Sequence, residues 1–131
     1  TLEVIETETL TVHAGHQAGQ HVMQLPLAER PDAIFAANDL LALGALQTLV
    51  MTGDAQIPRD ISLIGYDDIS FSASAVVPLS SVRQPAALIG ATAVDLLLAD
   101  SREDVEQPQI VYRPALVARD SSSRVGAPAT A

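Results

Sequence analysis

The 131-residue chain contains no cysteine, no tryptophan and no lysine. Without cysteine, disulfide bridges and zinc sites built from thiolates are excluded. Seven arginines stand against 16 acidic residues, and the formal net charge is -9. Nucleic-acid binding needs a basic face that neutralises phosphates, so this segment is not expected to bind DNA or RNA by itself. No apolar run approaches the ~18 residues of a membrane-spanning helix, so no membrane partner is expected either.

Hydrophobic residues make up 48% of the chain, which is typical of a folded α/β domain. At this length they are numerous enough to form a hydrophobic core. Residues 120–131 are rich in serine, alanine and proline, a composition that predicts a flexible tail. The chain begins with Thr1 and not with methionine, so we expect it to be a fragment of a longer protein, and the absence of a secretory signal therefore carries little weight.

Residues 31–68 are the centre of the predicted fold. Residues 33–37 and 61–66 are short apolar runs of the length expected for buried strands. Between them, Asp39 is expected to be the N-cap of a helix over residues 40–51, which Gly53 would end. Strand, helix and strand of these lengths predict a right-handed βαβ unit with parallel strands.

Further elements are expected on both sides of this unit. Apolar residues at helical spacing predict a helix over residues 13–25, and a second helix is expected over residues 85–100, where Pro85 suits the first turn. Short strands are expected over residues 1–5, 79–83, 109–112 and 116–119, and a short helix within residues 68–77. The predicted fold class is α/β, a parallel sheet with helices on both faces.

Three polar residues follow three of the predicted strands: Asn38, Asp67 and Gln84. The carboxyl ends of parallel strands meet at one edge of an open α/β sheet, and ligands bind at that edge. Two amides and a carboxylate supply both donors and acceptors, which suits a ligand with several hydroxyl groups. Alternatively, Asn38 and Asp39 only cap a helix and Asp67 only shapes a turn. The arrangement of three such residues at three strand ends favours a binding site.

Catalytic interpretations are less well supported. Asp67 and Asp68 would suit magnesium in a phospho-acceptor receiver domain, but such domains also need a lysine, which this chain lacks. Ser70, Ser72 and Ser74 are not surrounded by the G-x-S-x-G turn of a serine nucleophile. We therefore expect no enzyme and no cofactor.

The three histidines suggest a metal site, since His13 and His16 share a predicted helix face. Histidines on a polar helix face are more often solvated, and no acidic cluster lies beside His13, His16 or His21 in the sequence. We therefore expect no metal.

Four segments, in order, resemble the lactose and galactose repressor family (LacI/GalR) of bacterial transcription regulators. They are PDAIFAAND at residues 31–39 with ALG at residues 42–44, IPRDISLIGYDD at residues 57–68, PLSSVRQP at residues 78–85 and RPALVARDSS at residues 113–122. The resemblance runs from about residue 11 to residue 122. It implies a periplasmic-binding-protein-like (type I) C-terminal subdomain, in which residues 85–113 cross back to an N-terminal subdomain outside the chain.

The resemblance also assigns roles to residues. In this family the effector is contacted by the asparagine after the AA pair, the aspartate after the GY pair and the glutamine before the long helix, which implies Asn38, Asp67 and Gln84. Subunits of the family pair through the helix after the ND motif and the small-residue segment after YDD. This implies dimer contacts at Leu43, Leu46, Gln47, Ser74 and Ala75.

The expected function is therefore that of the effector-binding and dimerisation core, residues 1–119, of a cytoplasmic LacI-type regulator. The expected partners are a sugar-like effector, a second copy of the chain, and operator DNA only through a helix-turn-helix that precedes the chain. Because one wall of the cleft would lie in the N-terminal subdomain, we expect binding by this chain no tighter than about millimolar. The apolar face of the helix over residues 85–100 predicts a dimer or higher assembly.

The alternative is a periplasmic sugar- or solute-binding protein of a transport system, whose cleft uses the same strand-end positions. A signal peptide upstream of Thr1 would favour this alternative, whereas a helix-turn-helix would favour the regulator.

Overall fold

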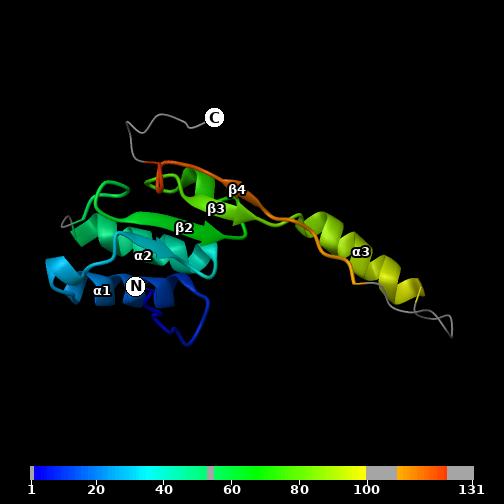
Figure 1. Ribbon diagram of the computed structural model, residues 1–131, viewed down its shortest axis with the longest axis horizontal. Coiled ribbons are helices and arrows are strands. Elements are labelled where there is room, and N and C mark those ends of the chain that lie inside the picture. Colours follow the sequence, from blue (N-terminus) through cyan, green and yellow to red (C-terminus); the bar gives the residue numbers. More distant parts are fainter. Residues whose placement is uncertain (1, 53–54, 100–108, 124–131) are drawn as a thin grey trace.

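The computed structural model describes residues 2–52, 55–99 and 109–123 (Figure 1). Its elements are, in order, α1 (Val12–Gln24), η1 (Leu27–Glu29), β1 (Ala33–Phe35), α2 (Asp39–Thr52), β2 (Ser62–Tyr66), η2 (Ser72–Ser74), β3 (Ser80–Arg83), α3 (Ala86–Ala99) and β4 (Ala115–Val117).

The four strands form one sheet in the order β1-β2-β3-β4. β1, β2 and β3 are parallel, and β4 runs antiparallel to β3. The predicted βαβ unit is therefore confirmed, with α2 connecting β1 to β2. The strands predicted within residues 1–5 and 109–112 do not form, and the short helix predicted within residues 68–77 is reduced to η2.

Two helices cover one face of the sheet in successive layers. α2 packs on β2, and α1 packs on α2 (Figure 1). Leu46, Leu63 and Leu79 are at most 1% exposed and form the centre of the core beneath this cover. The strand register places Phe35 and Leu116 on the opposite face, where they are 64% and 61% exposed. β1 is thus an edge strand with one open face, which is why it is less buried than its apolar sequence predicted.

α1 and α2 meet through glycines at their crossing. A Cβ atom on Gly44 would lie 2.0 Å from the carbonyl oxygen of Val12, and one on Gly15 would lie 2.1 Å from that of Leu41. Contacts this short leave no room for any side chain, so the spacing of the two helices depends on both glycines.

α3 projects from the sheet as an arm (Figure 1). As expected, apolar side chains along it are exposed, among them Leu88 at 50% and Leu97 at 73%. The segment that returns from the arm lies beside α3, where the hydroxyl groups of Tyr112 and Thr92 are 2.6 Å apart. Among the described residues, no helix combines the length and the hydropathy that crossing a bilayer would require.

The start of the predicted flexible tail belongs to the fold. Ser121 is fully buried; its hydroxyl donates to the Leu63 carbonyl at 2.6 Å and accepts from the Ser80 amide at 2.8 Å. Residues 120–123 therefore fasten the chain to β2 and β3, in contrast to the tail expected from residue 120. Residues 124–131 lie outside the described part.

β3 and β4 are both tied to Asp68, which follows β2. Arg83 donates from Nε to Asp68 Oδ2 at 2.6 Å, and Arg119 Nη2 lies 2.7 Å from Oδ1. The Asp68 side chain is only 3% exposed. Burial raises the pKa of the Asp68 carboxyl, but its contacts with the two guanidinium groups outweigh burial and hold the pKa below its ordinary value.

Replacing Gly44 by alanine is expected to destabilise the fold by about 1 to 3 kcal/mol, because the new methyl group forces α1 and α2 apart. Gly90→Ala in α3 is the matched control: nothing lies within 4 Å of the added Cβ, so helix propensity should make it neutral or stabilising by up to ~1 kcal/mol. Urea unfolding followed by circular dichroism measures both. Equal effects of the two substitutions would show that the helix crossing is not tight.

The depressed pKa of Asp68 predicts a specific acid sensitivity. Its contribution to the free energy of unfolding is full above about pH 5 and is lost as the pH falls below about 4, because protonation ends both ion pairs. Asp68→Asn should therefore lower stability at neutral pH and flatten its decline in acid.

Asp60→Asn is the control for this measurement. The hydrogen bond from Arg59 also lowers the pKa of Asp60, but solvent screens that exposed pair, so the variant should keep the acid decline of the parent chain. Unfolding free energies measured from pH 7 to pH 3 that fall equally in the parent and Asp68→Asn would contradict the prediction.

Candidate functional site

The carboxyl ends of three parallel strands lie at one edge of the sheet, which we call the carboxyl edge. β1, β2 and β3 end at Phe35, Tyr66 and Arg83. Asp67 and Gln84 come directly after β2 and β3, and Asn38 lies in the short link between β1 and α2. The fold therefore places the three predicted ligand residues at the edge where open α/β sheets bind ligands.

Asp67 and Gln84 are brought into direct contact there. The side-chain amide Nε2 of Gln84 donates to Asp67 Oδ1 at 2.9 Å. Asp67 is exposed and Gln84 is half-buried. A carboxylate and an amide that are 17 positions apart in the sequence thus form one polar unit open to solvent.

The backbone at this point is held in an uncommon conformation. Asp67 has a φ of 105° and Asp68 a φ of 53°, both in the left-handed region that side chains disfavour. The amide of Asp67 donates to the Val82 carbonyl at 2.9 Å, and that of Asp68 to the Ser81 hydroxyl at 3.0 Å. Such strain persists only where the surroundings fix it, and it clusters at functional sites. β3 thus fixes the direction of the Asp67 side chain.

Asn38, and not Asp39, is the N-cap of α2. Asn38 Oδ1 accepts from the Leu41 amide at 2.9 Å, and its Nδ2 donates to the Leu10 carbonyl at 3.2 Å. The prediction that Asp39 caps the helix is wrong by one residue, because Asp39 is already the first residue of α2. Among the described residues, the side-chain partners of Asn38 are Leu10 and Leu41, so Asn38 shares the carboxyl edge with the other two predicted residues without bonding to them.

Asp39 instead has a structural role that the sequence analysis missed. Its side chain is completely buried, and it accepts from the Ser81 hydroxyl at 2.6 Å, the Ser72 hydroxyl at 2.5 Å and the Ile69 amide at 2.9 Å. A Cβ atom on Gly65 would lie 2.2 Å from Asp39 Oδ1. Glycine in the middle of an otherwise apolar strand was the available signal that a neighbouring group approaches the backbone closely.

The residues predicted to contact a second subunit have different degrees of exposure. Gln47 and Ser74 are exposed, and Leu43 and Ala75 are half-buried beside the core. Leu46 is 1% exposed and packs inside the core. Its prediction as a surface contact is therefore wrong, because it lies on the face of α2 that is turned inwards.

Two of the side chains considered for catalysis and metal binding, Ser72 and His16, make contacts that support the fold. His16 Nδ1 lies 2.7 Å from the Thr48 hydroxyl between α1 and α2, and the Ser72 hydroxyl donates to Asp39. In the part of the chain that the structure describes, no three histidine or acidic side chains are gathered as a metal site would require.

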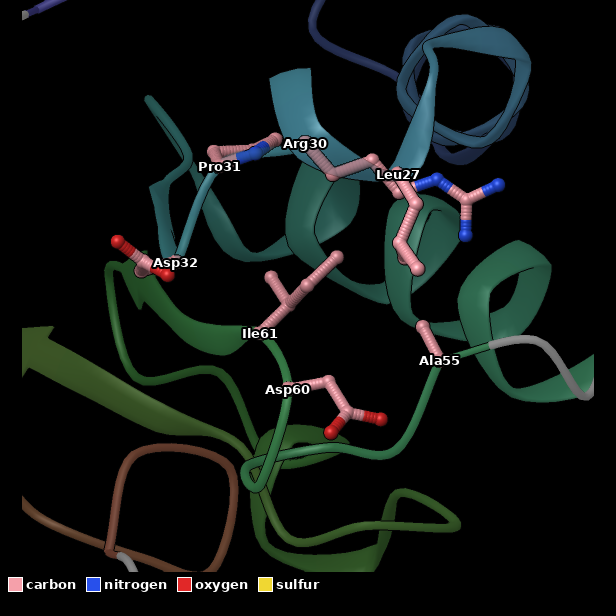
Figure 2. A pocket seen from close by; sticks show the side chains of 7 residues that line it. All are labelled: Leu27, Arg30, Pro31, Asp32, Ala55, Asp60 and Ile61. Atoms are coloured by element: carbon pink, nitrogen blue, oxygen red, sulfur yellow. The ribbon is translucent and has the colours of Figure 1, made fainter.

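Two hollows lie away from the carboxyl edge. A cavity of about 110 Å³ lies at the opposite, amino ends of β1 and β2 (Figure 2). Its lining is mixed apolar and charged: Leu27, Arg30, Pro31, Asp32, Ala55, Asp60 and Ile61. A hollow of about 350 Å³ lies between α3 and residues 110–112. Neither is lined by Asn38, Asp67 or Gln84.

The sequence was compared with family models and with curated proteins, and both comparisons point to the same family. Residues 3–122 match the family model of the periplasmic binding protein-like domain. The transcriptional repressor PurR of Aliivibrio fischeri is 36% identical over 106 residues, which are 80% of this chain and 31% of that protein. The chain spans about a third of the length of the curated relatives that it matches. These relatives are named as repressors, not enzymes.

Solved structures agree with the sequence comparison. A LacI family regulator from Lactobacillus casei with bound sucrose has a TM-score of 0.73 and 34% identity, and covers 86% of this chain and 41% of that one. The Lac repressor dimer bound to operator and the anti-inducer ONPF has a TM-score of 0.76 and 30% identity, with 86% and 38% covered. The chain therefore belongs to the periplasmic binding protein-like domain family, in the form found in LacI-type transcription regulators.

Proposed function

We propose that the chain is the effector-binding core of a LacI-type transcription regulator, and that a sugar-like ligand binds at the carboxyl edge. The observation that carries this proposal is the Asp67–Gln84 pair, an exposed carboxylate and amide fixed side by side at the ends of β2 and β3. The related regulator with bound sucrose supports a polyhydroxylated ligand.

The chemistry of the pair suits hydroxyl groups. The carboxylate of Asp67 accepts hydrogen bonds through two oxygens, and hydrogen bonds to a charged group contribute about 1.5 to 3 kcal/mol each. Gln84 adds a carbonyl acceptor and a further amide donor. Asn38 contributes its Nδ2 group if the ligand displaces the Leu10 carbonyl, which this group now contacts at 3.2 Å.

A second copy of the chain pairs, in this proposal, through the outer stripe of α2 and the adjacent η2 segment. We call this surface the α2 stripe; it consists of Leu40, Leu43, Gln47, Met51, Ser74 and Ala75. The α2 members recur at intervals of three and four residues, so they lie on one side of the helix. Met51 is 74% exposed and Leu40 is 38% exposed, and a partner would cover both.

Operator DNA is contacted, in this proposal, only through a helix-turn-helix outside the chain, because a net charge of -9 opposes binding to phosphates.

The regulator acts in the cytoplasm, where DNA is. Ligand binding changes DNA affinity only to the extent that the ligand prefers one arrangement of the dimer. The repressor names of the relatives favour this function over periplasmic transport.

Sugar titrations followed by NMR test the ligand site. Sucrose, glucose, cellobiose and ribose are added in turn to the labelled chain; at least one is expected to shift the backbone amide of Asp67 and the side-chain amide of Gln84. Asp67→Asn should weaken that binding about tenfold or more, because a charge-assisted acceptor is lost. Asp32→Asn, at the opposite end of the sheet, is the control and should leave affinity unchanged. Shifts confined to Arg30, Asp32 and Asp60 would place the ligand in the other cavity and contradict the proposal.

Sedimentation velocity over a range of concentrations tests the dimer. Gln47→Arg places two like charges at a symmetric interface without disturbing the core, and should raise the dimer dissociation constant about tenfold or more. Gln17→Arg makes the same change on the exposed side of α1 and should have no effect. A parent chain that sediments as a monomer, or an association that Gln47→Arg leaves intact, would exclude the α2 stripe.

A further inference from the structure

We propose that Asp68 is a positioning residue for the ligand site: by holding Arg83, it keeps the carboxylate of Asp67 free of a cation and open to hydroxyl donors of the ligand. The role rests on the proposed function, since it affects binding only where Asp67 contacts the ligand. Its effect on Asp67 itself can be measured without any ligand.

Two neighbouring aspartates have unequal partners in the structure. Both ion pairs at this end of the sheet are made by Asp68: Arg83 Nη2 lies 2.5 Å from Oδ2, and Arg119 Nη2 lies 2.7 Å from Oδ1. Within the described residues, the only partner of the Asp67 side chain is the neutral amide of Gln84. The cations are thus concentrated on the aspartate that faces inwards.

Arg83 and the residue after it contact the two neighbouring aspartates: Arg83 pairs with Asp68, and Gln84 bonds to Asp67. The side chain of Arg83 is itself 58% exposed. Arg83 pairs with Asp68, whose carboxylate is 3% exposed; the attraction between the two charges is screened less there than it would be at the exposed Asp67. Both aspartates have a left-handed backbone, with a φ of 105° at Asp67 and 53° at Asp68.

This division of partners determines what the site can bind. An arginine on Asp67 would occupy the acceptor oxygens that a hydroxyl group needs. Without that arginine, Asp67 presents a full negative charge beside the Gln84 amide, which suits neutral polyhydroxylated ligands. Asp68 therefore acts on the ligand through Arg83 and touches no ligand atom itself.

The test follows the side-chain amide signal of Gln84 by NMR in the chain without ligand. In Asp68→Asn the released Arg83 is expected to pair with Asp67 and to shift the Gln84 signal. Adding Arg83→Gln should return the signal to its position in the parent chain. The control is the double variant Asp68→Asn/Arg113→Gln, which lacks an exposed arginine that does not bond to Asp68. In this variant the Gln84 signal should stay shifted.

Sugar binding is measured in the same variants with whichever of sucrose, glucose, cellobiose or ribose binds the parent chain. Asp68→Asn is expected to weaken it about tenfold or more, and Asp68→Asn/Arg83→Gln to recover most of the loss. A purely structural role for Asp68 predicts the reverse order, because the double variant loses a further contact of β3.

The outcomes distinguish the role of Asp68 from the proposed function. An unchanged Gln84 signal in Asp68→Asn, or a shift that persists after Arg83→Gln, overturns the role of Asp68. If the signal moves and returns but no sugar binds any variant, the role of Asp68 stands and the proposed function fails. Should Asp68→Asn not fold, the same comparison is made with Arg119→Gln added, which removes the more buried cation together with the carboxylate.

Discussion

The buried carboxylate of Asp39 is the interaction on which the arrangement of the carboxyl edge depends. A fully desolvated charge is tolerated only when it is hydrogen-bonded, and Asp39 has two hydroxyl donors and a backbone amide. The first turn of α2 adds a favourable helix dipole. The donors are Ile69 and Ser72, in the segment after β2, and Ser81 in β3, so a single carboxylate joins the start of α2 to two other parts of the chain. Removing any one of them leaves a buried acceptor without its partner, which is more costly than the loss of an exposed contact.

A chain of contacts leads from Asp39 to Asp67, one of the residues proposed to bind the ligand. The Ser81 hydroxyl donates to Asp39 and accepts from the amide of Asp68, so a small side chain in β3 connects α2 to the turn after β2. That turn carries Asp67, whose own amide is held by Val82. The uncommon backbone at Asp67 is thus fixed from two sides, and the direction of its carboxylate is set before any ligand arrives. Preorganisation of this kind reduces the entropy that binding would otherwise cost.

The sequence allowed the four strands of the sheet, the three long helices and the meeting of Asp67 with Gln84 to be predicted, because strand length and parallel connection determine which residues share an edge; two further predicted strands do not form. It did not distinguish Asn38 from Asp39 as the cap, since either side chain suits that position and only the packing of Gly65 against the carboxylate decides between them. The burial of Leu46 depends on the rotation of α2 against the sheet, which an almost entirely apolar helix does not reveal. Ser121 was assigned to a tail because its composition is polar, whereas three-dimensional contacts with β2 and β3 bury it completely.

The attachment of the α3 arm connects it to the carboxyl edge of the sheet. The chain leaves the sheet for the arm after β3 and returns through β4; Asp68 holds Arg83 at the end of β3 and Arg119 two residues after β4. A displacement of either strand relative to α2 must stretch a charge-assisted contact to Asp68, which shares a peptide plane with Asp67. The turn that carries Asp67, the residue proposed to bind the ligand, is therefore connected to the base of the arm both by the ion pairs of Asp68 and by the bonds of Asp67 to Val82 and Gln84. A ligand shifts the arm through this connection only to the extent that it binds one arrangement of the turn and the arm more tightly than another. Because Asp67 is fixed by backbone bonds and Asp68 by ion pairs, the strength of that connection depends on charge, and it weakens when acid protonates Asp68.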